Sequence, residues 1–187
     1  MNASEKKERL IEAACALLDA APSKRLKTTN LNKALFYLDL IALRDYGATI
    51  TGCEYRAFEN GPVVNRYKEA LIDELVGRNL AKQDEEGMSK PLVLQTCISS
   101  FRYIDDEQRE CAANIARHIG GIDARKASDL SHKNPGWREA RRRGDCATID
   151  MFLAMQQVMD KDPWLDESLT PDELEALSSS SDSSSWN

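Results

Sequence analysis

The stretch that decides the fold reads Leu31-Asn-Lys-Ala-Leu-Phe-Tyr-Leu-Asp-Leu-Ile-Ala-Leu43. Its apolar residues recur at helical spacing and cover much of the circumference, which predicts a helix at the centre of the molecule. This helix is expected to begin after Thr28-Thr29-Asn30 and to end at Gly47, because glycine readily adopts the left-handed conformation that closes a helix. The most apolar stretch, Ala34 to Leu43, is interrupted by Asp39 and is about half as long as a membrane helix, so no membrane span is predicted.

Helical patterns also lie on both sides of this segment. A first helix is expected from Ser4 to Ala21, since Pro22 follows its last apolar residue. Asp105 and Gln108 form the pattern of a capping box. Helices are therefore predicted to begin at Asp105, Asp123, Pro135 and near Thr148.

Short strands are predicted between these helices. Residues 48–60 are rich in β-branched and aromatic side chains, which favour one or two strands. Gly61-Pro62 is then expected to open a third helix, because proline is tolerated in the first turn of a helix. Residues 80–83 and 92–96 flank a polar turn and predict a β-hairpin. The expected fold class is α+β and mainly α-helical: a helical domain with a small strand element and a β-hairpin.

The charge divides the chain into two parts. Of the net charge of −6, the segment from Asp160 to the end carries −7, because it holds eight acidic residues and one lysine. Residues 1–159 therefore carry +1, which argues against a general electrostatic grip on nucleic acid. We predict a domain over residues 1–160 and an acidic, serine-rich, disordered tail over residues 161–187. Deletion of residues 178–187 is expected to leave folding unchanged.

Cysteine and histidine spacing gives no sign of catalysis or metal binding. The five cysteines are scattered without a Cys-x-x-Cys pair, and the two histidines, His118 and His132, form no known catalytic motif with their neighbours. The sequence therefore predicts a protein that is not an enzyme and that holds no cofactor and no metal. The charged N-terminus lacks the apolar run of a signal peptide, so a cytoplasmic location is expected.

A DNA-binding alternative rests on the order helix, strand, helix and hairpin over residues 30–96, which resembles a winged helix. The third helix of this order carries acidic and basic residues in equal number, whereas a recognition helix needs several cations. The run Arg141-Arg142-Arg143 is explained by its position at a helix C-terminus. A winged-helix-like transcription regulator stays the alternative function, and nucleic acid is not the expected partner.

Five motifs occur in a set order and together resemble a known family. They are the helix motif Leu31-x-Lys-x-Leu-Phe-Tyr-x-Asp39, Tyr46-Gly47, Ile50-Thr-Gly-x-x-Tyr55, Gly61-Pro-Val63, and Leu130-Ser-His132 ahead of Trp137. In this order they resemble the SocA-like antitoxins, also called the Panacea domain family, over about residues 31–149. The resemblance implies an antitoxin that neutralises a cognate toxin protein by direct binding. Some members hand their toxin to a bacterial protease, and phage-associated relatives exist.

The surface expected to bind the partner is bordered by Tyr55, Gly61, Pro62, His132 and Trp137. The first three lie at a strand-to-helix turn, where binding residues often occur, and a tryptophan at a break can anchor an interface. The same residues can instead serve only the fold: Gly61-Pro62 as a helix-initiating turn, and His132 and Trp137 as structural side chains. If they bind the partner, Tyr55→Ala and Trp137→Ala should abolish neutralisation and leave the melting temperature within a few degrees.

Overall fold

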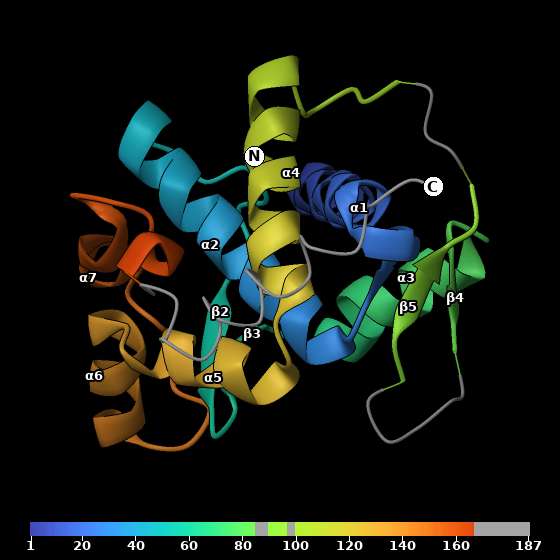
Figure 1. Ribbon diagram of the computed structural model, residues 1–187. Helices are drawn as coiled ribbons and strands as arrows, with labels where there is room; N and C mark the ends of the chain where they lie inside the picture. The colour runs from blue at the N-terminus through green and yellow to red at the C-terminus, as the bar shows by residue number, and fades with distance from the viewer. Residues whose placement is uncertain (85–89, 97–99, 167–187) are drawn as a thin grey trace, which may run out of the picture.

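The computed structural model describes residues 1–84, 90–96 and 100–166. Within these ranges the protein consists of seven α-helices and two small antiparallel sheets, which confirms the predicted mainly helical α+β class. Helix α2 (Thr28–Tyr46) passes through the middle of the molecule, and the other elements lie around it (Figure 1). No helix in the described part of the chain combines the length and apolar character needed to cross a membrane.

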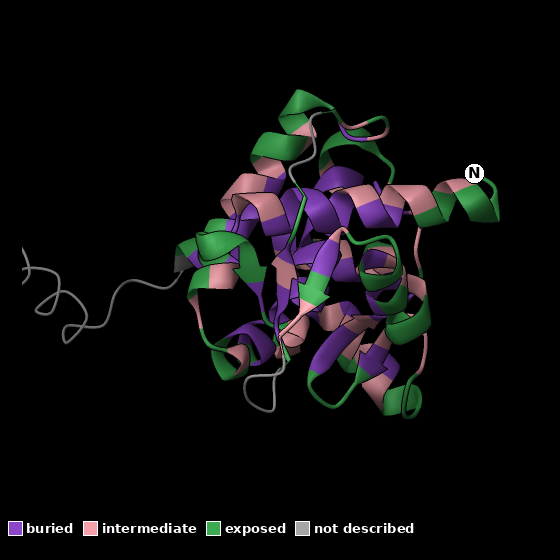
Figure 2. Cartoon of the chain, turned by 90° about the vertical axis from the view of Figure 1, so that its right-hand side faces the viewer, coloured by how far each residue is buried: buried purple, intermediate pink, exposed green. Residues whose placement is uncertain are grey.

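The burial of α2 follows from its sequence. Every residue from 30 to 43 is buried, because α1 (Ala3–Ala20), α4 (Asp106–Gly121), α5 (Ala124–His132) and the strand at Gly61–Val64 pack against it. Buried residues therefore run through the interior, while exposed residues occupy the outward faces of the surrounding helices (Figure 2). Gly47 ends α2 with a φ of +72°, the left-handed conformation predicted for this glycine.

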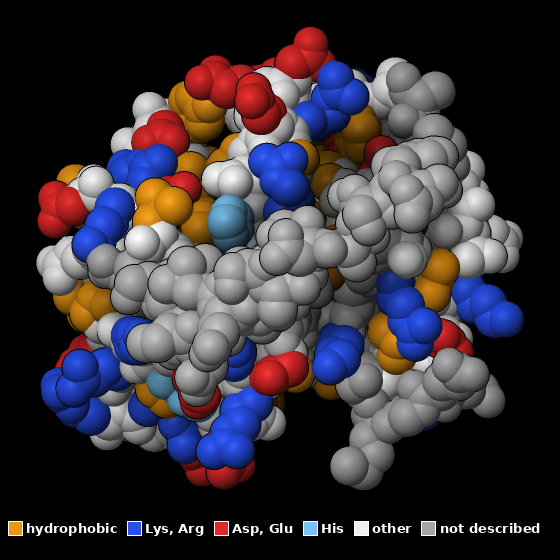
Figure 3. Space-filling model, viewed as in Figure 1, with side chains coloured by type: hydrophobic (Ala, Val, Ile, Leu, Met, Phe, Trp, Pro, Cys, Tyr) orange, Lys and Arg blue, Asp and Glu red, His pale blue; other side chains and the backbone are white. Residues whose placement is uncertain are grey.

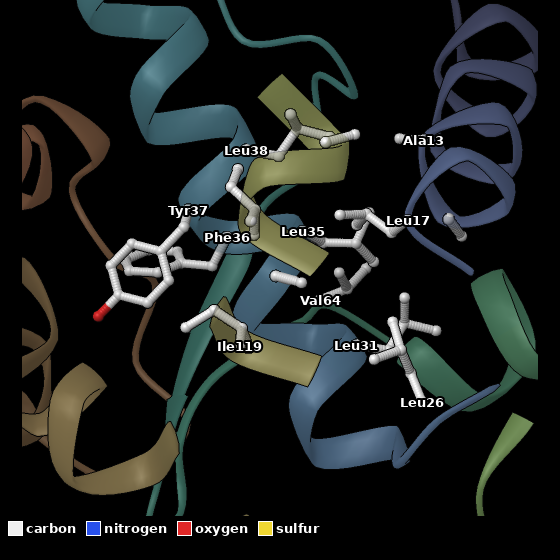
Figure 4. Close-up of a cluster of buried hydrophobic side chains, with 14 of the residues drawn as sticks. Ala13, Leu17, Leu26, Leu31, Leu35, Phe36, Tyr37, Leu38, Val64 and Ile119 are labelled. Carbon is white, nitrogen blue, oxygen red and sulfur yellow. The ribbon is translucent and has the colours of Figure 1, made fainter. Parts of the chain in front are cut away.

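The core is divided by α2 into two sides. On one side Leu35 packs towards Leu17 of α1, and on the other Phe36 and Tyr37 point away from α1 (Figure 4). The ring of Phe36 makes edge-to-face contacts with Tyr37 and with Tyr55, at centroid distances of 5.6 and 5.3 Å. A helix that is apolar on most of its circumference can form both contact layers at once.

Side-chain caps fix the starts of the other helices. Asp105 and Gln108 form the predicted capping box of α4, and Asp123 caps α5 as expected. Helix α6 (Pro135–Arg143) begins after Asn134, whose side chain accepts a hydrogen bond from the backbone N–H of Trp137. Helix α1 begins after Asn2 rather than at Ser4, and the last helix, α7 (Met151–Met155), is shorter than the pattern suggested.

One sheet has the strand order β1-β5-β4. Strands β4 (Ala81–Gln83) and β5 (Leu92–Leu94) form the predicted hairpin, whose turn lies outside the described residues. Strand β1 (Arg25–Leu26) pairs with β5, an addition that its two residues are too short to reveal in the sequence. This sheet lies on the side of the molecule that carries α3 (Asp73–Gly77) (Figure 1).

The prediction that Gly61-Pro62 opens a helix is wrong. These residues begin strand β3 (Gly61–Val64), which pairs antiparallel with β2 (Tyr55–Phe58), and the helical segment starts later, with a π-helical turn at Lys68–Ile72 followed by α3. Proline suits either place, because both a helix start and a strand edge tolerate the missing N–H. Hydrogen bonds that helices elsewhere in the fold make to this segment favour the strand over the helix.

The C-terminal segment extends the core beyond the predicted domain end at residue 160. Trp164, within the single turn Pro163–Asp166, is buried. It packs edge-to-face on Tyr37 and stacks on His118, at centroid distances of 5.7 and 5.6 Å. The first residues assigned to the tail therefore pack on the helical domain. The serine run and the short helix considered at residues 170–177 lie outside the described residues.

Candidate partner-binding site

The β2–β3 hairpin, residues 55–64, is held by buried polar side chains of α2. The ammonium of Lys33 donates a hydrogen bond to the carbonyl oxygen of Pro62 at 3.0 Å. Next to it, the Oδ1 atom of Asn32 accepts a hydrogen bond from the backbone N–H of Val64, also at 3.0 Å. Both side chains are almost fully buried. The central helix therefore supplies hydrogen bonds as well as apolar surface, and these bonds place β3.

Helices α5 and α6 bind the other side of the hairpin. The hydroxyl of Ser128 donates to the carbonyl of Asn60, and the indole Nε1 of Trp137 donates to the carbonyl of Phe58, each at 3.0 Å. The guanidinium of Arg141 donates to the carbonyl of Ala57 at 3.3 Å. Together with Asn32 and Lys33, three helices thus fix the backbone of this short hairpin. We call this set of contacts the hairpin clamp.

Gly61 allows the clamp to close. Its φ is +103°, a conformation that side chains with a Cβ rarely adopt. A Cβ at this position would lie 2.6 Å from the Cε of Lys33, and closer still to the hydroxyl of Ser131. Glycine is therefore required both by the backbone angle and by the approach of two helices.

A second buried network fixes the start of β2. The carboxylate of Asp39 accepts hydrogen bonds from the backbone N–H of Thr51 at 2.9 Å, from the Thr51 hydroxyl, and from the Tyr55 hydroxyl at 2.8 Å. Burial raises the pKa of Asp39, and these hydrogen bonds act in the opposite direction because they favour the charged form. This network ties α2 to the loop that leads into the hairpin.

Lys33 is a buried cation. Burial lowers the pKa of its ammonium to about 7, because a charge loses favourable hydration when it leaves water. In the described part of the chain, its one hydrogen-bond partner is the carbonyl of Pro62, and no carboxylate forms an ion pair with it. Because this pKa lies near neutral pH, the charge of Lys33 inside the clamp depends on the pH and on nearby charges.

His132 and Trp137 stack on each other beside the hairpin, with ring centroids 4.3 Å apart and an interplanar angle of 16°. Both residues are half-buried. Burial lowers the pKa of His132, which keeps the ring neutral at physiological pH. The stack therefore lies next to the tip of the hairpin, and both residues remain partly accessible.

The structure gives the five predicted partner-binding residues different positions. Tyr55 is fully buried, so the expectation that its side chain borders an accessible surface has to be corrected: its hydroxyl is needed by Asp39. Gly61 and Pro62 are also buried, within the clamp. His132 and Trp137 keep partial exposure, and a role for them in partner binding stays a prediction.

The most accessible apolar residue of the hairpin was missed by the sequence analysis. Phe58 precedes the hairpin turn and has an exposed fraction of 39%. Its neighbours Glu59 and Asn60 are exposed as well, so the tip offers an aromatic ring between polar groups. Phe58 faces outwards because β2 pairs with β3. The sequence pattern predicted a helix start at Gly61-Pro62 and therefore did not indicate this pairing.

Basic side chains gather over α6, at the lower left of the space-filling view (Figure 3). Arg141 pairs with Asp145 at 2.6 Å and Arg142 pairs with Glu139 at 2.9 Å, so local carboxylates balance part of this charge. The winged-helix alternative loses support elsewhere, because its third helix shrinks to a π-helical turn and the five residues of α3.

No group of three or more histidine, cysteine, aspartate or glutamate residues in the described ranges is arranged to hold a metal ion. Of the five cysteines, the four that the structure describes are free thiols; they are Cys15, Cys53, Cys111 and Cys146. Cys97 lies outside the described residues. The absence of a metal and of a cofactor stays a prediction.

Comparison with known proteins gives one result for this region. The family model described as "Antitoxin SocA-like, Panacea domain" matches residues 31–138, which is more than half of the chain. The matched range runs from α2 into α6 and contains the clamp residues Asn32, Lys33, Ser128 and Trp137 together with the whole hairpin. Neither the curated proteins nor the solved structures contain a significant match.

Proposed function

Because the chain belongs to the SocA-like antitoxin family with a Panacea domain, we propose that it neutralises a cognate toxin protein by binding it directly. In this proposal the protein acts in the cytoplasm, and it needs neither catalysis nor a cofactor. The proposal includes delivery of the bound toxin to a bacterial protease, a role that the family resemblance implies for some members. An origin in a prophage fits the same proposal.

The observation that carries this proposal is the hairpin clamp. Side chains from α2, α5 and α6 fix the hairpin through its backbone carbonyls, while Phe58, Glu59 and Asn60 remain exposed at its tip. A binding element that is already ordered loses little conformational entropy when a partner docks. The hairpin therefore has the properties of a preformed recognition element on a rigid helical scaffold.

We place the toxin-binding surface at the hairpin tip and the adjoining His132–Trp137 stack. The hydrogen bond from Trp137 to the carbonyl of Phe58 makes these two aromatic residues neighbours. Aromatic side chains with a polar surround are frequent centres of protein interfaces, where truncation of one ring costs about 2 kcal/mol or more. Phe58 is the better anchor to test, because its side chain is more exposed and makes no contact of the clamp.

Co-expression with candidate toxins encoded beside the gene tests the function. The wild-type protein should restore growth in the presence of its cognate toxin, and Phe58→Ala should weaken this rescue and the binding measured with purified proteins at least tenfold. The matched control is Phe152→Ala, on α7, since Phe152 has an exposed fraction of 70% and lies outside the proposed surface. Both variants should keep the wild-type melting temperature.

Two outcomes would contradict the proposal at different levels. If the wild-type protein binds none of the neighbouring gene products and rescues growth from none, the antitoxin function fails. If Phe58→Ala binds and rescues as well as Phe152→Ala, the function stands but the hairpin tip is not the toxin-binding surface.

A further inference from the structure

A pocket with a volume of about 510 Å³ lies beside the hairpin, between it and the sheet that contains β4 and β5. Its walls come from four parts of the chain: the start of α2, the hairpin, the π-helical turn with the residues around it, and the edge of the sheet. Its lining residues include Thr28, Lys33, Phe58, Tyr67, Lys68 and Lys90.

The charges that line this pocket are mainly positive. Among the described residues, Lys33, Lys68 and Lys90 line the pocket with three amino groups, and Asp73 is the one carboxylate, which pairs with Lys68 at 3.4 Å. Lys33 has no carboxylate partner among the described residues, as shown above. The pocket therefore combines an excess of positive charge with a lysine whose burial is not compensated by an anion of the protein.

The start of α2 adds to this positive potential. The residue before the helix, Lys27, makes no capping hydrogen bond with its side chain, and the first turn contains no acidic residue. The Thr28 hydroxyl is used elsewhere, since it donates to the carbonyl of Lys90 at 3.1 Å. Helix N-termini carry a partial positive charge and free N–H groups, which favour a nearby anion.

Two partly exposed aromatic rings line the same pocket. Phe58 and Tyr67 have exposed fractions of 39% and 36%. Phe58 is also the residue that we place at the centre of the toxin-binding surface. The pocket thus continues that surface, and its lining combines aromatic rings with lysine side chains.

We propose that this pocket binds a glutamate or aspartate side chain of the toxin, taken from a segment that places an apolar residue next to the acidic one. This inference rests on the proposed function and specifies the chemistry of the partner. Charge complementarity selects the occupant, because an excess of lysines favours a carboxylate and disfavours a basic segment. The exposed rings of Phe58 and Tyr67 contact the apolar neighbour.

Blocked peptides test the pocket without knowledge of the toxin. The probes are N-acetyl-Ala-Leu-Glu-Phe-Ala-amide and the same peptide with glutamine in place of glutamate, each titrated into the full-length protein and followed by amide chemical shifts. The glutamate peptide should shift the signals of Thr28, Asn60 and Tyr67 and should bind at least tenfold more tightly than the glutamine peptide. Equal binding, or no shift at these positions with either peptide, would overturn the proposal.

Variants of exposed lysines locate the contact. Lys68→Gln combined with Lys90→Gln should weaken the glutamate peptide at least tenfold and leave the glutamine peptide unchanged. Lys82→Gln is the matched control, since Lys82 is also exposed and lies on β4 but does not line the pocket. If Lys82→Gln weakens binding as much as the double variant, general surface charge explains the result and the pocket does not.

The same variants separate this inference from the antitoxin function. When the wild-type protein neutralises its toxin but the double lysine variant neutralises it equally well, the function stands and the acidic contact is refuted. When the wild-type protein neutralises no toxin, the proposed function fails, and the peptide titration still decides whether the pocket recognises a carboxylate.

Discussion

The ammonium of Lys33 lies 3.0 Å from the carbonyl oxygen of Pro62, and this hydrogen bond joins the most buried helix to the hairpin. This hydrogen bond gives a structural reason for a lysine in the middle of an apolar helix and for the Gly-Pro pair opposite it. The lysine satisfies a buried carbonyl, and the adjacent Gly61 leaves space for its side chain. A buried carbonyl without a partner would cost about 1–3 kcal/mol.

Gly61→Ala should destabilise the protein by about 2–4 kcal/mol, because the new Cβ would meet the Lys33 side chain and would force alanine into a strained conformation. Gly47→Ala is the control with a positive φ but nothing within 4 Å, and it should cost only about 1 kcal/mol. Urea unfolding of the two variants measures the difference. Equal losses would mean that the clamp yields without strain.

Stability should rise with pH above 7 because of Lys33. Its pKa is about 7 in the folded protein and 10.5 in an exposed lysine, so between these values the unfolded chain binds a proton that the folded chain does not. Unfolding then becomes less favourable as pH increases, by up to about 1.4 kcal/mol per pH unit. From pH 7.5 to 9, wild type should gain about 2 kcal/mol relative to Lys33→Met, as measured by urea unfolding at each pH.

The charged groups near Lys33 do not account for the expected difference in stability between wild type and Lys33→Met. His132 of α5 interacts with it electrostatically, but the pKa of His132 is lowered from 6.5, so this ring is neutral over the whole range. Arg141 of α6 and Asp129 of α5 also act electrostatically on His132. A difference between wild type and Lys33→Met that stays constant from pH 7.5 to 9 would show that Lys33 is not a buried cation of low pKa.

The Tyr55 hydroxyl should matter for stability rather than for direct contact with a partner. Tyr55→Phe removes a hydrogen bond to the buried Asp39 carboxylate and should cost about 1–3 kcal/mol at pH 7. Tyr67→Phe is the matched control on a partly exposed tyrosine and should change the free energy of unfolding by less than about 0.5 kcal/mol. Urea unfolding at pH 7 distinguishes them, and equal effects would contradict the network.

The hydrogen-bond network around Asp39 also predicts in which direction stability changes with pH. The Tyr55 hydrogen bond favours the charged form of Asp39, whereas burial raises the pKa of this carboxyl above its ordinary value. Between the ordinary value and the raised one, the folded protein binds more protons than the unfolded chain, so the stability contributed by Asp39 falls as pH rises. Loss of this hydrogen bond raises the pKa of Asp39 further, so the cost of Tyr55→Phe should grow as the pH rises through the raised pKa, as urea unfolding over a pH series measures.

Periodicity and capping patterns were sufficient to predict most of the helices. The buried character of α2, the capping box at Asp105 and the left-handed Gly47 follow from local preferences, which neighbouring residues determine. The strand at Gly61-Pro62 could not be predicted in this way. Its conformation depends on hydrogen bonds from Asn32 and Lys33, which lie about thirty residues earlier in the chain.

The sequence does contain a signal for the clamp. Asn30, Asn32, Lys33 and Asp39 are polar residues buried within a mainly apolar helix, and buried polar groups need partners. Four such residues on the central helix indicate that other segments bring hydrogen-bonding groups to it. The exposure of Phe58 carries no comparable signal, because a phenylalanine in a short strand is more often part of the core.

Trp164 should anchor the end of the helical domain, although composition alone placed it in the tail. Its ring stacks on His118 of α4 and meets Tyr37 of α2 edge-on, which joins the last described turn to the two helices at the centre of the core. Trp164→Ala should cost about 3 kcal/mol, as expected for truncation of a buried aromatic side chain. The adjacent residue is the control: Leu165 has an exposed fraction of 64%, so Leu165→Ala should change the free energy of unfolding by less than about 0.5 kcal/mol. Thermal and urea unfolding of both variants measure these effects. If Trp164→Ala is as stable as Leu165→Ala, the domain ends near residue 160, as the change in composition suggests, and residues 163–166 contribute nothing to the fold.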